Sequence, residues 1–443
     1  MERLLGEMRL ALEGSGFEDK VYIVGGLVRD TLLGREAADP DFMIDGDPAA
    51  VCRLLAEKGF GDRPSYLPEF YSAKLCRGNV LIEMTGGRAE IYTPGSRRPA
   101  TRPAPLEEDA FRRDFTVNAL YRHLFSGEIL DPTGMGLADL QAGVLRTPID
   151  PGESFRQDPL RILRGIRFAA QLDMELSPGT ARAAAEAAGE TDTLSADRRR
   201  EELTRLLLLP DPCKGLRLLA ELGIMPHLLP GLEKLAGYTS RPGSDVWEHT
   251  LRVVRGVKAE PALRYSALLH DISKPRVAKT LPDGSLSFPG HAAASAEMAR
   301  ELLSGLGMPA HVIHRVCRLI EEHNCFFKCS GDRDFRYLIH KNRDVIPELL
   351  RLMKSDKLAA AGGPERLEAM LKTYDRLRTP DLLQKELSPL SGEELRRDFG
   401  LTGKSAGRAK ALLRESVLRG SLSGGDREEA KRLVAKSLEE GSL

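Results

Sequence analysis

Two aspartates on either side of a proline, Asp39 and Asp41 in ADPDFMID, are the strongest candidates for chemistry in this chain. Successive side chains of a β-strand point to opposite faces, so a spacing of two places both carboxylates on one face. Paired carboxylates suit Mg²⁺, which keeps several waters and completes its shell with substrate phosphates. Two such ions can stabilise the attacking and the leaving oxygen of an in-line displacement. The pair therefore predicts a nucleotidyl-transfer site.

A glycine turn precedes the two aspartates. KVYIVGG is a β-branched run that ends in Gly25 and Gly26, which predicts a strand entering a tight turn close to a ligand. LVRDTLLG continues with apolar residues at helical spacing and stops at Gly34, which predicts a helix. Free N–H groups at a helix start favour phosphate, so we expect a triphosphate to bind beside this turn. The positively charged Arg29 on the same helix would then hold it.

Two further segments carry polar side chains next to apolar runs. Glu83, in NVLIEMTGGRAEIY, lies on another predicted strand, where it is either a third carboxylate of the site or a surface residue. RRDFTVNAL places Arg113, Asp114 and Asn118 directly before an apolar run. The alternative for this second set is that Asp114 caps a helix while the arginines are solvated.

The segment FRQDPLRILRGIRFAAQL has a specific pattern of donors and acceptors. Asp158 and Arg161 are three residues apart, which makes them neighbours on one face of a predicted helix. A carboxylate accepts hydrogen bonds and a guanidinium only donates them. Together they match cytosine or adenine, each with an exocyclic amine beside an unprotonated ring nitrogen, but not guanine or uracil. The alternative is an ordinary surface ion pair.

A third set of residues combines histidines with carboxylates. VWEHTLRVV contains His249, ALLHDISKP contains His270 and Asp271, and RLMKSDKLAA contains Asp356, in the order of the HD metal-dependent phosphohydrolases that they resemble. Imidazoles and carboxylates suit a catalytic divalent metal such as Mn²⁺, Ni²⁺, Co²⁺ or Mg²⁺. His291 and His323 complete or extend such a site. A lone histidine at a helix end is more often a satisfied or solvated residue, and a purely structural domain is the alternative.

The elements that position these residues change along the chain. Residues 1–150 mix short strand-like runs (VYIVGG, DFMID, NVLIEMT, GEILDP) with helices, which predicts a small α/β head. Amphipathic helices separated by Pro/Gly breaks follow, and we divide them into a neck (151–225), a second helical domain (226–360) and a tail (361–443). A chain of 443 residues is long enough for two to four domains. The predicted fold class is α+β.

Composition sets limits on partners and compartment. The chain has 65 basic and 65 acidic residues, so any RNA surface must be local. No apolar run approaches the ~20 residues that a membrane span needs. The six cysteines are scattered, which favours reduced thiols over a disulfide framework and predicts a cytoplasmic protein.

The head and neck segments, taken in order, resemble the class II tRNA nucleotidyltransferases (CCA-adding enzymes) and their bacterial poly(A) polymerase relatives, which have a DNA-polymerase-β-like head. RRDFTVNAL matches a signature of that family throughout. The resemblance implies Mg²⁺ at Asp39 and Asp41 and tRNA, CTP and ATP as partners of a monomer or homodimer. It also implies nucleotide contacts from the following residues: Gly25, Gly26, Arg29, Arg113, Asp114, Asn118, Asp158, Arg161 and Arg164.

Some features of the resemblance leave alternatives open. The family's base-reading motif has an acid where this chain has Gln157, which can still hydrogen-bond and orient Arg161. LSADRRREELTRLL resembles the last neck motif, in which we expect Asp197 to cap a helix and Arg198 to support the neck. The tail carries a basic turn that predicts a tRNA phosphate contact, formed by Gly403, Lys404, Gly407, Arg408 and Lys410.

Several functions compatible with these motifs remain to be separated. An enzyme that adds only CC, one that adds only the terminal A, and a poly(A) polymerase would all share the head. A protein that is chiefly an HD phosphohydrolase is the alternative from a different class. The HD residues would then act on phosphates such as those at RNA 2′ or 3′ ends.

Overall fold

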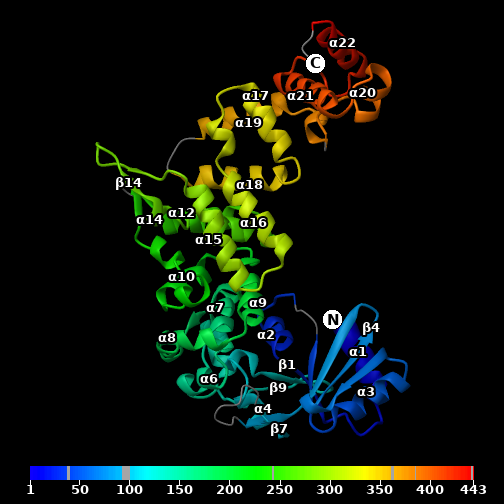
Figure 1. The fold of residues 1–443 in the computed structure, drawn as a ribbon. Coiled ribbons are helices and arrows are strands. Elements are labelled where there is room, and N and C mark those ends of the chain that lie inside the picture. The colour runs from blue at the N-terminus through cyan, green and yellow to red at the C-terminus, as the bar shows by residue number, and fades with distance from the viewer. Residues whose placement is uncertain (37–39, 92–99, 242–243, 361–363, 385, 441–442) are drawn as a thin grey trace. The chain divides into compact units, whose positions relative to one another are not determined.

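The computed structural model describes residues 1–36, 40–91, 100–241, 244–360, 364–384, 386–440 and 443 (Figure 1). These residues divide into two compact units, Met1–Pro230 and Gly231–Leu443. Each unit has its own set of buried apolar side chains. The predicted catalytic residue Asp39 lies outside the described residues.

A mixed seven-stranded sheet forms the centre of the head. Its order is β3-β4-β5-β2-β1-β8-β9, with β2 parallel to β5 and the other neighbours antiparallel. The strands are β1 (Val21–Val24), β2 (Asp41–Ile44), β3 (Asp62–Leu67), β4 (Ser72–Arg77), β5 (Val80–Gly86), β8 (Tyr121–His123) and β9 (Ile129–Leu130). The strands predicted at VYIVGG, DFMID, NVLIEMT and GEILDP are therefore confirmed.

Alternation along the strands gives this sheet one apolar face. In β5, Ile82 and Met84 are buried in the core, while Glu83 between them points to the opposite face. Helices α1 (Glu2–Leu12) and α3 (Pro48–Glu57) contribute their buried leucines to the same core. The opposite face carries a smaller cluster of buried apolar residues that includes Val24, Met43 and Tyr121. It also carries Asp41 and Glu83, so we call it the polar face, and the site lies there.

Helices dominate from residue 151 onward, as the sequence predicts. The remaining helices of the first unit are α2 (Gly26–Leu32), α4 (Leu106–Phe111), α5 (Gly136–Ala142), α6 (Pro151–Gln157), α7 (Leu160–Leu172), α8 (Pro178–Glu186), α9 (Ala196–Leu207), α10 (Cys213–Glu221) and α11 (Met225–Leu228). Short strand pairs join β6 (Arg88–Ile91) to β7 (Ala100–Pro103) and β10 (Val144–Leu145) to β11 (Glu175–Leu176). Helix α7 packs against α9 and α10 through its apolar face.

The described part of the second unit is helical apart from two short strand pairs. These are β12 (Thr239–Arg241) with β13 (Ser244–Asp245), and β14 (Lys279–Thr280) with β15 (Leu286–Ser287). The helices are α12 (Val246–Gly256), α13 (Pro261–Leu269), α14 (Lys274–Val277), α15 (His291–Gly305), α16 (Ala310–Glu322), α17 (Asp332–Lys341), α18 (Ile346–Ala359), α19 (Glu365–Leu377), α20 (Gly392–Phe399), α21 (Gly403–Arg419) and α22 (Arg427–Glu439). The predicted α+β class is confirmed.

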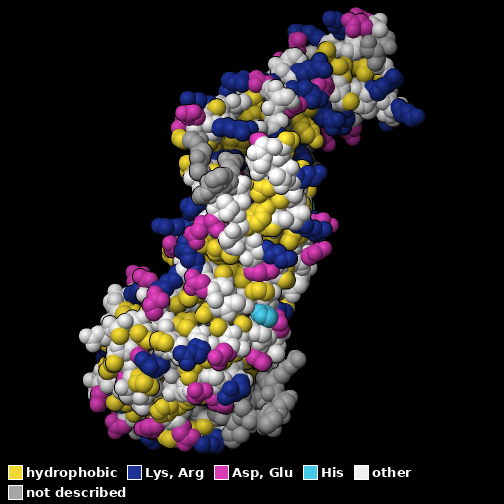
Figure 2. Space-filling view, turned by 90° about the vertical axis from the view of Figure 1, so that its left-hand side faces the viewer, with side chains coloured by type: hydrophobic (Ala, Val, Ile, Leu, Met, Phe, Trp, Pro, Cys, Tyr) yellow, Lys and Arg dark blue, Asp and Glu magenta, His cyan; other side chains and the backbone are white. Residues whose placement is uncertain are grey.

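The surface agrees with the charge composition. Basic and acidic side chains are interspersed on the face that Figure 2 shows, in keeping with the equal numbers of the two kinds. Among the described residues, no helix combines the length and the apolar character that crossing a membrane requires.

Candidate functional site

A row of registered residues crosses the polar face of the head sheet. Asp41 of β2 pairs with Val24 of β1 on one side and with Glu83 of β5 on the other. Glu83 in turn pairs with Lys74, and Val24 pairs with Tyr121. Directly paired residues share a face of a sheet, so Asp41 and Glu83 are neighbouring carboxylates. Lys74 Nζ lies 2.5 Å from Glu83 Oε1 and partly balances their charge.

The glycine turn follows this row directly, because Gly25 comes after Val24. Gly25 has φ 68°, in the left-handed region that favours glycine, and it precedes the first residue of α2. A Cβ atom on Gly25 would lie 3.6 Å from Arg113 Nη1, and one on Gly26 would lie 3.6 Å from Arg29 Nη2. The turn therefore brings backbone without side chains next to two guanidinium groups, as a site for an anionic ligand requires.

A buried chain of hydrogen bonds joins four of the predicted nucleotide-binding residues. Arg29 Nη1 donates to Asn118 Oδ1 at 2.6 Å, and Asn118 Nδ2 donates to Asp114 Oδ1 at 2.9 Å. Arg164 Nε of α7 donates to the other oxygen of Asp114 at 2.9 Å. Burial alone would raise the pKa of Asp114, but the charge of Arg164 and these hydrogen bonds outweigh it, so the pKa is lowered. Asp114 is thus a carboxylate that fixes the positions of Asn118 and Arg164.

Arg113 is held by an aspartate that the sequence analysis did not select. Asp109, which has no exposed surface, accepts hydrogen bonds from Arg113 Nη2 at 3.0 Å and from the Tyr121 hydroxyl at 2.7 Å. Burial raises the pKa of Asp109, but the charges of Arg113 and Arg112 overcome this effect and lower the pKa to about 2. An acid three and four residues before two arginines on a helix was the signal that would have identified it.

Helix α7 adds an aromatic ring and a buried ion pair that the sequence analysis also missed. The ring of Phe168 has the guanidinium groups of Arg29, Arg164 and Arg167 at 5.2, 5.3 and 4.2 Å from its centroid. Arg167 Nε also donates to Glu202 Oε2 of α9 at 2.7 Å. These contacts fix α7, which carries Arg164, between Arg29 of α2 and Glu202 of α9.

The proposed base-reading pair differs from the sequence prediction. Helix α6 ends at Gln157 and α7 begins at Leu160, so Asp158 and Arg161 do not share one helix face. Pro159 explains the break, because proline disfavours helical backbone in the residue before it, and Asp158 is extended at φ −145°. The expectation of neighbours on one helix was therefore wrong.

The two residues also have separate partners. Both carboxylate oxygens of Asp158 lie 3.1 Å from Arg198 Nη2 of α9. The guanidinium of Arg161 is buried and donates to Ser154 Oγ at 2.7 Å and to the Arg112 carbonyl at 2.5 Å. Among the described residues, no ion pair joins Asp158 to Arg161, so the base-reading role of this pair stays a prediction.

Two smaller expectations in the neck are also corrected. Gln157 does not orient Arg161, since its amide donates to Glu153 Oε1 at 3.1 Å within the exposed last turn of α6. Ser195 rather than Asp197 caps α9, by accepting a hydrogen bond from the Arg198 N–H, and Asp197 pairs with Arg200 instead. The support that Arg198 gives to the neck agrees with its contact to Asp158.

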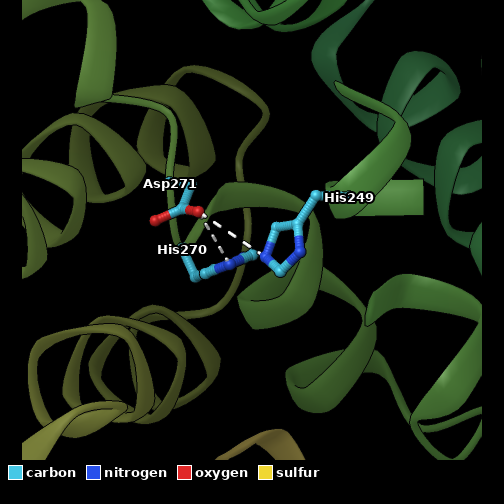
Figure 3. Close-up of side chains that lie close together, drawn as sticks. All are labelled: His249, His270 and Asp271. Carbon is cyan, nitrogen blue, oxygen red and sulfur yellow. Dashed lines mark ion pairs between the residues drawn. The ribbon is translucent and has the colours of Figure 1, made fainter. Parts of the chain in front are cut away.

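The second unit brings together the predicted histidines and carboxylates (Figure 3). His249 comes from α12, His270 and Asp271 follow α13, and Asp356 comes from α18. His270 Nε2 lies 3.1 Å from Asp271 Oδ2, and His249 Nε2 lies 3.1 Å from Asp356 Oδ1. The ligand atoms of His249, His270 and Asp271 all lie within 4.8 Å of one another. This is the spacing of atoms that can share one metal ion.

The hydrogen bonds of the histidines orient them for metal binding. The Nδ1 atoms of His270, His291 and His323 lie 2.8, 2.9 and 2.6 Å from backbone carbonyls, so each Nδ1 carries a proton and each Nε2 is the ring atom left for a metal. The Nε2 of His323 lies 2.6 Å from Asn324 Nδ2, from which it accepts a hydrogen bond. His270 Nε2 and both oxygens of Asp271 are buried without a hydrogen bond of good geometry. His291 and His323 form a second group of candidate ligands with Asp271. A metal ion would satisfy these atoms.

Electrostatics keep the carboxylates of this cluster ionised. Burial alone would raise the pKa of Asp271, but the charges of His270 and Lys274 lower it well below its usual value. The pKa of Asp356 is likewise lowered by the hydrogen bond from His249 and the charge of His270, against the effect of burial. Burial and the charge of His270 lower the pKa of His323 to about 3, so this imidazole is neutral. Burial would lower the pKa of His270, but Asp271 and Asp356 raise it, so a metal ion would have to displace the second proton of this imidazole.

Comparisons with known proteins match domains in both units. The profile of the Poly A polymerase head domain matches residues 21–146, that of the probable RNA and SrmB-binding site of polymerase A matches 173–235, and that of the HD domain matches 246–361. The A-adding tRNA nucleotidyltransferase of Deinococcus radiodurans is 33% identical, over 96% of this chain and 97% of its own. The CC-adding tRNA nucleotidyltransferase of Thermus thermophilus is 34% identical, over 93% and 92%.

Solved structures give the same fold. The Bacillus stearothermophilus CCA-adding enzyme in complex with CTP has a TM-score of 0.72 at 21% identity, covering 99% of this chain and 98% of that one. Fold and matched domains together define a nucleotidyltransferase with an HD domain. The chain belongs to the class II tRNA nucleotidyltransferase and bacterial poly(A) polymerase family, as its motifs indicated.

Proposed function

We propose that this enzyme adds the nucleotides of the CCA end to tRNA, using CTP and ATP. The row that places Asp41 and Glu83 directly beside the glycine turn carries the proposal, because metal-dependent nucleotidyl transfer needs carboxylates next to phosphate-binding groups. Nearly equal identity to an A-adding and a CC-adding relative supports transfer of both nucleotides. The alternatives are an enzyme that adds only CC, one that adds only A, and a poly(A) polymerase.

The carboxylates of the row fit Mg²⁺, which binds oxygen ligands and leaves room for phosphate. In this proposal Asp39 and Asp41 hold the metal, with Glu83 as a third carboxylate. When bound, Mg²⁺ would activate the RNA 3′-hydroxyl and stabilise the departing pyrophosphate. The protein would contribute chiefly by positioning the two substrates and by balancing charge.

The residues around the glycine turn would bind the nucleotide. Backbone N–H groups at Gly25 and Gly26 and the guanidinium of Arg113 would contact the triphosphate, since Arg113 lies beside the turn. Arg29 reaches the same place, although three of its hydrogen bonds are already made to Asp30 and Asn118. Its role would therefore be to fix Asn118 as well as to add positive charge.

Asp114, Asn118 and Arg164 would hold the sugar and the base-proximal part of the nucleotide. Asp158 and Arg161 would then select cytosine or adenine by one acceptor and one donor. Asp158 can leave Arg198 for a base because their contact is part-exposed, whereas Arg161 is fixed by Ser154 and the Arg112 carbonyl. Selection of the base would thus combine a movable acceptor, Asp158, with a fixed donor, Arg161.

A second activity is favoured by one specific observation: the Nε2 of His270 and the carboxylate of Asp271 are buried without a hydrogen bond of good geometry, although they form ion pairs with each other and with Lys274. We propose that His249, His270, Asp271 and Asp356 bind a divalent metal (Mn²⁺, Ni²⁺, Co²⁺ or Mg²⁺), with His291 and His323 extending the site. The site would hydrolyse phosphate esters such as those at RNA 2′ or 3′ ends. Purified protein that shows no metal-dependent phosphatase or cyclic-phosphodiesterase activity would leave this domain a structural one.

The rest of the proposal concerns organisation. We propose a head (1–150), a neck (151–225), an HD domain (226–360) and a tail (361–443). The matched ranges 21–146 and 246–361 support the head and the HD domain, whereas the match over 173–235 runs past the proposed end of the neck. The basic turn at the start of α21, which includes Lys404 and Arg408, would contact tRNA phosphates. A cytoplasmic monomer or homodimer is part of this proposal.

The test is extension of tRNA that ends before CCA. The protein and Mg²⁺ would be incubated with this tRNA and CTP, ATP, both, or all four nucleotides, and the products sequenced. Growth by CCA followed by arrest is the expected result. Growth by CC or by A alone would assign a partial enzyme, and continued A addition would assign a poly(A) polymerase. Absence of any extension would overturn the proposal.

A further inference from the structure

The second unit has a positively charged hollow that neither proposed activity uses. It lies where the C-terminal halves of α12 and α18 meet, and it encloses about 420 Å³. Gly256 forms part of its lining, and the two helices approach so closely there that a Cβ on Gly256 would clash with Ser355 Oγ. Ser355 Oγ is itself held by a 2.9 Å hydrogen bond to the Val253 carbonyl. The hollow is therefore bounded by rigid helix packing.

Four cationic side chains line this hollow, and we therefore call it the cationic hollow: Arg252, Lys258, Arg351 and Lys354. None of the described residues that line it is acidic or aromatic. Lys258 pairs with Glu260 at 2.5 Å, and Arg252 Nε donates to the Ala359 carbonyl at 3.2 Å. Across the described ranges, no ion pair is made by Arg351 or Lys354. Of the two acids of α18, Glu348 pairs with Arg315 at 2.5 Å, and Asp356 pairs with His249 and Lys357 in the histidine cluster.

The negative charge at the C-termini of α12 and α18 is too small to balance the four cationic side chains. A helix C-terminus carries about half a negative charge, so α12 and α18 together offset about one of the four positive charges. Glu260 offsets another, because it pairs with Lys258 and the charge of Arg351 also lowers its pKa. About two positive charges are left for a partner outside the chain. An anion with two regularly spaced charges is the natural match.

We infer that the cationic hollow binds the sugar-phosphate backbone of the tRNA substrate, an inference that rests on the proposed function. A sphere of this volume is about 9 Å across, enough for two successive phosphates of a strand with a charge every ~3.4 Å of rise. Arginine and lysine are the residues that contact phosphate, and the absence of a lining aromatic ring leaves no platform for base stacking. The contact is thus independent of sequence and positions the RNA.

The test compares tRNA affinity at several salt concentrations for the full-length wild type and the R351A/K354A variant. Losing two phosphate contacts lowers the magnitude of the slope of log K against log salt by about 1.8, or about 1.4 for a single strand, and weakens binding by about 25-fold to 60-fold at 0.1 M salt. The R351K/K354R variant keeps both charges and is expected to retain the wild-type slope. The K20E/K58E variant, which reverses two exposed charges of the head, is the control for non-specific attraction.

The outcomes separate this inference from the proposed function. Wild-type slope and affinity in R351A/K354A, in a protein that adds CCA normally, would overturn the inference and leave the function intact. If the wild type extends no tRNA, but binds tRNA with a salt slope that is smaller in R351A/K354A, the inference stands and the proposed function is overturned. Equal losses in R351A/K354A and K20E/K58E would show general attraction and also overturn the inference. At saturating tRNA, the R351A/K354A variant is expected to add nucleotides at the wild-type rate.

Discussion

The head site and the histidine cluster are suited to ligands of opposite charge. In the head, arginines surround a glycine turn, and the buried polar atoms of Asp114, Asn118 and Arg29 are hydrogen-bonded to one another. In the second unit, His270 and Asp271 leave lone pairs buried without a good hydrogen bond. The first arrangement suits an anion such as a triphosphate, and the second suits a cation. The two proposed metal sites therefore differ in chemistry, since the head offers carboxylate oxygens and the second unit offers imidazole nitrogens as well.

The largest effect is expected from Asp41→Asn. Removing this charge takes away a ligand of the proposed Mg²⁺ site, so the rate of CMP or AMP addition should fall by about 10³-fold or more. Asp41 is exposed at the edge of the site, so the fold should be kept. Single-turnover tRNA extension measures the rate. Asp62→Asn, at an exposed position of β3, is the control, and normal addition by the Asp41 variant would contradict its role.

Next in size is the effect of Asp271→Asn on the other site. The change removes the carboxylate shared by both candidate ligand groups, so tight binding of Mn²⁺ or Ni²⁺ should be lost and any phosphohydrolase activity should fall at least about a hundredfold. Metal analysis after gel filtration measures the first effect, and phosphoester hydrolysis the second. CCA addition should persist. If the variant keeps its metal, Asp271 is not a required metal ligand.

A smaller effect is expected on base choice. Asp158→Ala removes the proposed acceptor, so preference for CTP and ATP over UTP and GTP should fall about tenfold to a hundredfold. Arg198→Ala is the matched control, because it removes the partner of Asp158 but keeps the carboxylate. Competition among the four nucleotides, read by sequencing, measures both. Retained selectivity in the Asp158 variant would mean that another group reads the base.

The smallest effect concerns stability in acid. The pKa of Asp109 is about 2 in the fold, below its ordinary value of 3.8, so its contribution to stability is present above about pH 4 and is lost as the pH falls toward 2. The shift corresponds to about 2 kcal/mol. Between pH 5 and pH 2, the stability of the wild-type head should therefore fall by about 2 kcal/mol more than that of Asp109→Asn. Hydrogen exchange of the β1 and β8 amides measures it, and parallel curves would refute the assignment.

The sequence predicted those elements whose side chains alternate clearly. VYIVGG and NVLIEMT contain the apolar alternation of half-buried strands, and the order of histidines and aspartates predicted which residues would meet in the second unit. Strands β3 and β4 were missed because DRPSYL and SAKLCR contain few apolar residues, and pairing with neighbours rather than propensity makes them strands. The register that places Glu83 beside Asp41 depends on the same long-range pairing.

Local backbone rules account for the other differences. Periodicity alone extends one helix through Asp158 and Arg161, but Pro159 divides it, and the two side chains then find partners in α9 and α6. The sequence also gave no direct signal for Phe168 and Glu202, whose partners lie on other elements. Their functional meaning follows from contacts that only the folded chain makes.

Two lysines beside the histidine cluster should stabilise the second unit when a chelator removes a bound metal. Lys274 Nζ lies 2.5 Å from Asp271, and Lys357 Nζ lies 2.7 Å from Asp356, so each candidate ligand carboxylate has a cation of its own chain within reach. Internal ammonium groups can therefore stand in for an external ion and prevent two buried negative charges from repelling each other. Unlike a small zinc finger, whose folding depends on its metal, this domain is expected to survive demetallation and to reload without refolding.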